Sequence, residues 1–88
     1  MAKYNLRMKK SARKELESIA TKADRLRIIE RIQSLAENPR PRGSQKLSGF
    51  ERYRIRQGNY RILYSIKNAE LVIYVIKIGD RKDVYRRS

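Results

Sequence analysis

The second half of the chain carries strand-like patterns of hydrophobic and polar residues. In Tyr53–Gln57 and Tyr60–Lys67 the two kinds of residue largely alternate, as they do when successive side chains leave a strand on opposite faces. Leu71–Ile78 is almost continuously apolar, which predicts a strand buried on both faces in the middle of a sheet. Turn residues separate or end these runs at Gly58-Asn59, Asn68-Ala69 and Gly79-Asp80.

The first half of the chain has the spacing of amphipathic helices. Between Lys9 and Ala20, apolar residues recur on one stripe at Ala12, Leu16, Ile19 and Ala20. After a break at Thr21–Asp24, a second helix is predicted to about Glu37, with an apolar side made of Ile28, Ile29, Ile32, Leu35 and Ala36. Thr21 or Asp24 is expected to cap this helix, and Asn38-Pro39 to stop it.

These patterns predict a single α+β domain over residues 1–88. A short strand at Lys3–Met8 precedes the helices, and Lys46-Leu47 begins a further strand after a loop at 40–44. The order is therefore β-α-α-β-β-β, an antiparallel-rich sheet with the two N-terminal helices packed on one face. A chain of 88 residues builds only a thin core, so a partner that covers apolar surface would stabilise it.

The charge of the chain points to an anionic partner. Lys and Arg number 23 against 9 Asp and Glu, a formal net charge of +14, which is far more than solubility requires. Nucleic acid, an anionic membrane or an acidic protein would each offset the self-repulsion. With neither a membrane-length apolar run nor a signal-peptide pattern, we expect a cytoplasmic protein that does not use a membrane. Cys and His are absent, so we expect neither a zinc site nor a histidine-based triad. We also expect no other metal and no cofactor.

Arginines gather on one face of a predicted strand. In Tyr53-Arg54-Ile55-Arg56 the two arginines share a face, and this face should be the open one because helices must cover the apolar side. Further members of the cluster follow the hairpin or the last strand, at Arg61, Arg81 and Tyr85. Guanidinium groups match phosphate oxygens and an aromatic ring can stack on an unpaired base, so the cluster predicts a site for single-stranded RNA.

The remaining basic and aromatic residues receive less specific roles. Contacts with the RNA backbone are predicted for Lys46, Arg52, Lys77 and Lys82, of which Lys77 is an isolated charge in an apolar run. Solvated surface or generic backbone contact is expected for Arg7, Lys9, Lys10, Arg13, Lys14, Lys22, Arg25, Arg27 and Arg31. Core or edge packing is expected for Tyr60, Tyr64 and Tyr74.

Two stretches of the chain resemble the RelE/ParE toxins of bacterial and archaeal toxin–antitoxin pairs. The first is Lys46–Gly49 followed by Tyr53–Arg56 and Gly58–Tyr64, and the second is Val75–Tyr85. Because the length and element order agree as well, the resemblance covers essentially the whole chain. It implies a type II toxin held inactive by an acidic RelB-like antitoxin. RelE-type members cleave mRNA in the ribosomal A site without a metal ion: the 2′-hydroxyl attacks the neighbouring phosphate and leaves a 2′,3′-cyclic phosphate.

The resemblance also implies catalytic roles for individual residues. Arg54 and Arg56 match the two basic positions of the strand, and Arg61 matches the arginine that stabilises transition-state charge. Arg81 matches the residue suggested as general acid, and Tyr85 matches the aromatic residue that stacks on the substrate base. The resemblance therefore places the active site on the open face of the sheet.

One departure from the family pattern bears on the mechanism. The two basic strand residues of the best-studied members are lysines, one of them suggested as general base, whereas arginine is a poor proton acceptor near neutral pH. Lys46, Lys77 and Glu51 are the remaining candidates for a base. Otherwise catalysis rests on orienting the phosphate and stabilising charge.

Three other functions are compatible with the same sequence. A ParE-type toxin would share the fold but inhibit DNA gyrase without ribonuclease activity; the set Arg54, Arg61, Arg81 and Tyr85 favours the ribonuclease. A non-catalytic nucleic-acid-binding module would make dispersed contacts and would tolerate the loss of one arginine. A toxin that has lost its activity would survive as an antitoxin partner.

Overall fold

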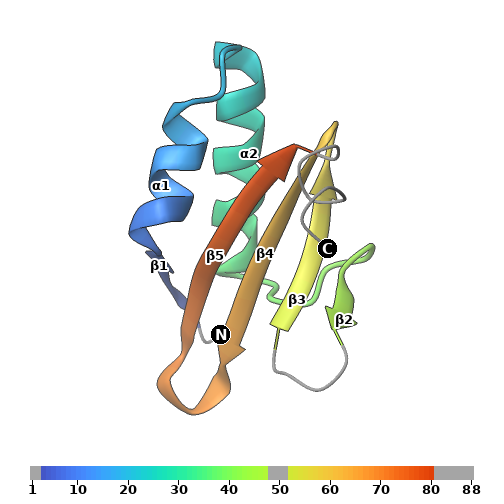
Figure 1. Cartoon of the computed structure of the whole chain (residues 1–88). Helices are drawn as coiled ribbons and strands as arrows, with labels where there is room; N and C mark the ends of the chain where they lie inside the picture. Colours follow the sequence, from blue (N-terminus) through green and yellow to red (C-terminus); the bar gives the residue numbers. More distant parts are fainter. Residues whose placement is uncertain (1–2, 48–51, 81–88) are drawn as a thin grey trace.

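A computed structural model of the chain, which describes residues 3–47 and 52–80, confirms the predicted α+β order (Figure 1). The strands are β1 (Asn5–Met8), β2 (Gln45–Leu47), β3 (Arg52–Gln57), β4 (Tyr60–Lys67) and β5 (Val72–Asp80). The helices are α1 (Lys10–Glu17), α2 (Lys22–Leu35) and a short 3₁₀ turn, Asn68–Glu70. None of the helices in this described part is long and apolar enough to cross a membrane.

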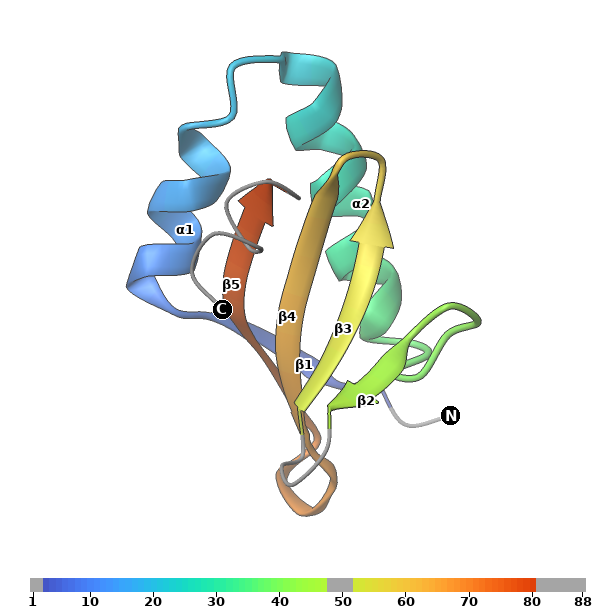
Figure 2. The same ribbon diagram turned by 45° about the vertical axis from the view of Figure 1, so that its right-hand side comes forward.

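The five strands form one sheet in the order β1-β5-β4-β3-β2. β1 runs parallel to β5, and every other neighbouring pair is antiparallel. Both helices lie on the same face, with α2 behind the sheet in the turned view of Figure 2. The helices leave the other face of the sheet uncovered, as the sequence predicts. Polar side chains on this uncovered face can therefore contact a ligand.

Some boundaries differ from the sequence-based expectations. α1 ends at Glu17, and the break lies at 18–21 instead of 21–24. The Ser18 hydroxyl donates to the backbone carbonyl of Glu15 at 2.8 Å, a local bond of the kind that competes with helix continuation. Thr21 occupies the N-cap position of α2, as one of the two expectations has it, although its side chain makes no capping hydrogen bond.

The last strand also differs from its expected limits. Leu71 belongs to the turn before β5, with a left-handed φ of 55°. Gly79 and Asp80, expected as a turn after the strand, belong to β5, because they pair with Arg61 and Tyr60 of β4. β5 lies between β1 and β4, and it is buried on one face only, since both helices pack on the same side. The expectation of burial on both faces is therefore wrong.

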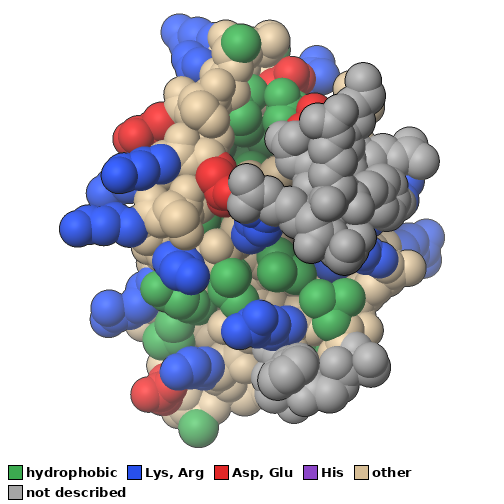
Figure 3. All heavy atoms as spheres, viewed as in Figure 1, with side chains coloured by type: hydrophobic (Ala, Val, Ile, Leu, Met, Phe, Trp, Pro, Cys, Tyr) green, Lys and Arg blue, Asp and Glu red, His purple; other side chains and the backbone are tan. Residues whose placement is uncertain are grey.

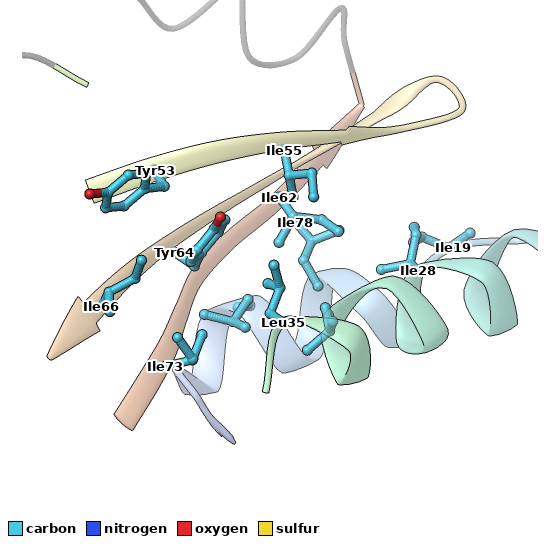
Figure 4. Close-up of a cluster of buried hydrophobic side chains, with 13 residues drawn as sticks. Ile19, Ile28, Leu35, Tyr53, Ile55, Ile62, Tyr64, Ile66, Ile73 and Ile78 are labelled. Atoms are coloured by element: carbon cyan, nitrogen blue, oxygen red, sulfur yellow. The ribbon is translucent and has the colours of Figure 1, made fainter. Parts of the chain in front are cut away.

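The core lies between the helices and the covered face of the sheet (Figure 4). Ile28, Ile32 and Leu35 of α2 meet the apolar residues of the central strands. The buried sheet residues are Tyr53, Ile55, Ile62, Tyr64, Ile66, Ile73, Val75 and Ile78, and α1 adds Ala12. Because Tyr53 and Ile55 are on this side, alternation sends Arg54 and Arg56 to the opposite side.

Two stacked tyrosines fasten the loop after α2 to this core. The rings of Tyr53 and Tyr64 lie 5.8 Å apart, and the Tyr64 hydroxyl donates to the carbonyl of Pro39 at 2.7 Å. Arg40 donates from Nε to the Tyr53 hydroxyl at 3.0 Å and lies over the Tyr53 ring. Tyr64 is therefore a core residue, as expected, and its hydroxyl satisfies a loop carbonyl.

Replacing Tyr64 by phenylalanine is expected to lower the free energy of unfolding by about 0.5–1.5 kcal/mol, because the Pro39 carbonyl loses its donor while the ring stays in place. Burial raises the pKa of Tyr64 above its ordinary value of 10.0. The stabilisation linked to this shift is complete below the unfolded pKa and is lost as the pH rises through the folded pKa. Urea titrations at neutral pH and above pH ~10 measure both effects.

The matched control for this variant is Tyr74→Phe, which alters a half-buried ring on the open face of the sheet. Wild type should lose more stability than Tyr64→Phe on passing to the alkaline condition. Equal losses in wild type and Tyr64→Phe, or an equal neutral-pH effect of the two tyrosine variants, would contradict this account of Tyr64.

Candidate nucleic-acid interface

The strand register brings the predicted arginines together on the open side of the sheet. Arg56 of β3 lies directly opposite Arg61 of β4, and Arg54 lies opposite Leu63, which in turn faces Lys77 of β5. Residues directly opposite one another on neighbouring strands share a face of the sheet. We call this surface the arginine face and define it by Arg52, Arg54, Arg56, Arg61 and Lys77.

The Arg56–Arg61 pair places two like charges side by side on the arginine face. Like charges directly opposite on antiparallel strands are destabilising, by up to about 1 kcal/mol. Arg56 is exposed, whereas Arg61 is only 6% exposed. A buried guanidinium group costs solvation energy unless it is compensated. Two adjacent cations with this arrangement provide forked donors for an anionic group that binds over them.

Arg54 is oriented by a neighbour that sequence reasoning did not identify. Its Nη2 atom donates to Oε1 of Gln45 at 2.6 Å, and Gln45 is its direct partner on the edge strand β2. The guanidinium group is half-buried and keeps further donors for a ligand. The hydrogen bond restricts the side chain before any ligand binds, which lowers the entropic cost of binding.

A β-bulge brings Lys77 to the arginine face. The register between β4 and β5 pairs Leu63 with Lys77 but Tyr64 with Val75, so Ile76 is the extra residue in β5. Unbroken alternation from Val75 would have directed Lys77 toward the core. The bulge reverses the alternation, so that Ile78 enters the core and Lys77 shares a face with Arg54.

Glu15 of α1 holds the end of this bulged strand. Its carboxylate accepts from Lys77 Nζ at 2.9 Å and from the backbone N–H of Ile78 at 3.0 Å. β1 pairs with β5 only as far as Val75, so Glu15 covers the part of the β5 edge that β1 leaves unpaired. A hollow of about 380 Å³ beside this contact is lined by residues that include Glu15, Lys77 and Gly79. Sequence reasoning missed Glu15 because only the fold brings α1 beside β5.

The other predicted site residues divide among three locations. Arg52 is exposed on the arginine face, where it opposes Ser65. Lys46 opposes Tyr53, so its side chain leaves the sheet on the helix-covered side. Glu51, Arg81, Lys82 and Tyr85 lie outside the described residues. Arg7 of β1, for which we expected only generic contact, opposes Tyr74 and so extends the basic surface toward the β1 edge.

The surface around the arginine face is basic and partly apolar. Figure 3 shows Lys and Arg side chains along the α1 side and over the sheet, with hydrophobic side chains between them. Within residues 3–47 and 52–80, no three Asp or Glu side chains gather closely enough to hold a metal ion. The groups present can bind phosphates through charge-assisted hydrogen bonds and contact bases through apolar area.

Comparisons with known proteins agree on one family. A family model described as the ParE toxin of a type II toxin–antitoxin system, parDE, matches residues 6–85. The RelE of an archaeal RelE–RelB complex from Pyrococcus horikoshii OT3 superposes with a TM-score of 0.81 and 33% identity, over 92% of this chain and 97% of that one. No curated protein sequence matches the chain.

Two further solved structures show the same fold. A free Escherichia coli RelE carrying two arginine-to-alanine substitutions has a TM-score of 0.77 and 26% identity, over 96% of this chain and 92% of that one. The toxin of a RelB–RelE complex from Methanococcus jannaschii has a TM-score of 0.72 and 26% identity, over 92% of this chain and 96% of that one. The similarity therefore extends over nearly the full length of each chain.

Proposed function

The chain belongs to the RelE/ParE family of type II toxins, and from this membership we propose that it is a RelE-type endoribonuclease that cleaves mRNA in the ribosomal A site. The observation that carries the proposal is the convergence of Arg54, Arg56 and Arg61 on one face of a sheet. The sequence of the chain is 33% identical to that of an archaeal RelE of the same fold, and this similarity favours the ribonuclease branch of the family.

In the proposed reaction, a phosphate of the mRNA strand is transferred from the 5′-oxygen of one nucleotide to the 2′-oxygen of the nucleotide before it. The 2′-oxygen of one nucleotide forms a bond to the adjacent phosphorus, the bond from phosphorus to the 5′-oxygen breaks, and a 2′,3′-cyclic phosphate remains. Arg56 and Arg61 bind the attacked phosphate and stabilise its developing negative charge. Arg54, held by Gln45, orients the same strand. Arg81 protonates the leaving 5′-oxygen, and Tyr85 stacks on the base.

Positioning supplies most of the catalysis in this proposal. Arginine is a poor base, Lys46 leaves the sheet on the helix-covered side, and Lys77 already donates to Glu15. The proton of the 2′-hydroxyl therefore passes to water. Holding the 2′-oxygen in line with the breaking bond can by itself supply a large part of the acceleration.

Partners and location follow from the same proposal. Arg52, Lys46, Lys77 and Lys82 contact mRNA or ribosomal RNA through phosphates, and the codon in the A site supplies the substrate. A RelB-like antitoxin with an acidic surface inhibits the toxin and offsets part of its charge of +14. The protein acts in the cytoplasm, where ribosomes are.

A gyrase inhibitor of the ParE type is the second candidate function. It is favoured by one observation, namely that the matching family model is the ParE toxin. In that case the arginine face would serve protein or DNA contact without chemistry at a phosphate of RNA.

Assays with purified components distinguish the two candidate functions. Ribosomes programmed with a short labelled mRNA and a vacant A site are incubated with the chain, and gyrase is tested separately for DNA supercoiling. The ribonuclease proposal predicts mRNA fragments ending in a 2′,3′-cyclic phosphate only when ribosomes are present, with unchanged supercoiling. Intact mRNA together with loss of supercoiling would establish the second candidate instead.

A further inference from the structure

The Glu15 carboxylate joins helix α1 to the end of the arginine face. α1 lies beside β5 in both ribbon views (Figures 1 and 2). The two carboxylate oxygens have separate partners: Oε2 accepts from Lys77 Nζ at 2.9 Å, and Oε1 accepts from the backbone N–H of Ile78 at 3.0 Å. Glu15 therefore fixes a side chain and a backbone group of two consecutive residues at once.

Lys77 is the member of the arginine face whose position depends on Glu15. It follows the β-bulge and lies beyond Val75, where the pairing of β1 with β5 ends. It is diagonally across from Arg61, because Lys77 pairs with Leu63 while the residue two positions further along β5 pairs with Arg61. The Cα atoms of such diagonal neighbours are about 7–8 Å apart, within reach of long side chains. A shift of Lys77 would therefore change the surroundings of the Arg61 guanidinium group.

The same contact weakens the attraction of this part of the face for RNA. The side chains of Lys77 and Glu15 are 35% and 30% exposed, so the pair lies at the boundary with solvent. A carboxylate beside an ammonium group cancels much of the field that a phosphate would meet there. In a chain of net charge +14, a surface that served affinity alone would not place an acidic residue at this point. Glu15 is accounted for if the position of Lys77 contributes more to the reaction than its full charge would contribute to binding.

On the premise of the proposed ribonuclease function, we propose that Glu15 is a positioning residue of the active site. Through the ion pair it holds Lys77 on a phosphate of the mRNA strand beside Arg61, and through the N–H of Ile78 it holds the end of β5. The attacking 2′-oxygen and the phosphate then stay in line for the reaction, while part of the affinity for RNA is lost. Glu15 itself neither contacts the substrate nor takes its proton.

The test measures cleavage rate and RNA affinity of the full chain separately. Glu15→Gln keeps an oxygen that can accept from the Ile78 N–H but removes the charge that holds Lys77. The rate is measured under single-turnover conditions, with the chain in saturating excess over ribosomes that carry a labelled mRNA and a vacant A site. Affinity is measured with the same ribosomes carrying a 2′-deoxynucleotide codon, which has no 2′-hydroxyl and stays intact.

Two further variants complete the design. Glu17→Gln is the matched control, since it removes the same charge from an exposed residue of α1 that does not line the hollow beside β5. Lys77→Gln, alone and combined with Glu15→Gln, shows whether Glu15 acts through Lys77. Thermal melting verifies that each variant folds.

We expect Glu15→Gln to cleave about tenfold more slowly at saturation, because the phosphate is held less accurately. The same variant should bind the deoxynucleotide complex about two- to fivefold more tightly at low salt, because Lys77 gains its full charge. Glu17→Gln should stay near wild type in both measurements. Lys77→Gln should lower the rate to a similar extent, and adding Glu15→Gln to it should change the rate little.

Each other result would contradict the positioning role. A wild-type rate in folded Glu15→Gln would overturn this role and leave the proposed function intact. Loss of affinity together with rate would overturn it as well, because that result indicates damage to the end of β5. If Glu15→Gln did not fold, a wild-type rate in Lys77→Gln would equally overturn the role, and slower cleavage would support it. If wild type itself left the mRNA intact, the proposed function would fail and the positioning role with it.

Discussion

Arg61→Ala is expected to lower the rate of ribosome-dependent mRNA cleavage by about 100- to 1,000-fold, the cost of removing one donor from a site that stabilises developing charge. Arg61 lies at the hairpin end of the arginine face, between Arg56 on β3 and Gly79 on β5. It is also the most buried cation described, so its charge acts with less screening than a surface arginine has. The rate is measured with programmed ribosomes under single-turnover conditions.

Two further variants separate charge, geometry and folding. Arg61→Lys keeps the charge but loses the planar fork of donors, so we expect it to recover only part of the rate. Arg27→Ala removes an exposed arginine of α2 that is not part of the arginine face. This variant should cleave mRNA at the wild-type rate. Thermal melting of each variant shows whether the domain is intact. If folded Arg61→Ala cleaved mRNA at the wild-type rate, Arg61 would not be an active-site residue.

Leu35→Ala is expected to lower the free energy of unfolding by about 2–5 kcal/mol, through lost burial and the cavity left behind. Leu35 is 0% exposed in the layer between α2 and the sheet. Domains of this kind are stable by only about 5–15 kcal/mol in total. The substitution therefore removes a large share of the stability of the chain, and urea unfolding followed by circular dichroism measures it.

The matched control for Leu35 lies on the same helix. Leu26 is 50% exposed, so Leu26→Ala should change the free energy of unfolding by less than about 0.5 kcal/mol. Equal effects of the two variants would show that α2 does not pack on the sheet through Leu35. Adding antitoxin should raise the apparent stability of both variants, because ligand binding to the folded state shifts the unfolding equilibrium.

Three residues of the arginine face could be predicted from the sequence, namely Arg54, Arg56 and Arg61. Strict alternation in β3 places Tyr53 and Ile55 in the core, and this alone determines the face on which Arg54 and Arg56 lie. The two-residue hairpin at Gly58-Asn59 then sets the register that puts Arg61 opposite Arg56. Gly58 has a φ of +60°, which glycine adopts without strain. Both inferences depend only on local rules.

The rest of the site depends on contacts between distant segments, which local patterns do not contain. The bulge at Ile76 changes the face of Lys77, although nothing in the apolar run from Val72 to Ile78 distinguishes Ile76 from its neighbours. Glu15 reaches β5 across 62 residues of sequence, and Gln45 meets Arg54 only because β2 pairs with β3. For the same reason, the parallel pairing of β1 with β5 could not be anticipated.

The central claim is that the arginine face cleaves mRNA on the ribosome, and mapping mRNA 5′ ends in cells that express wild type or Arg61→Ala tests it most directly. We predict growth arrest with codon-phased cleavage inside translated regions for wild type, and neither effect for the variant. Growth arrest by both proteins without new mRNA ends would contradict the claim and favour gyrase as the target.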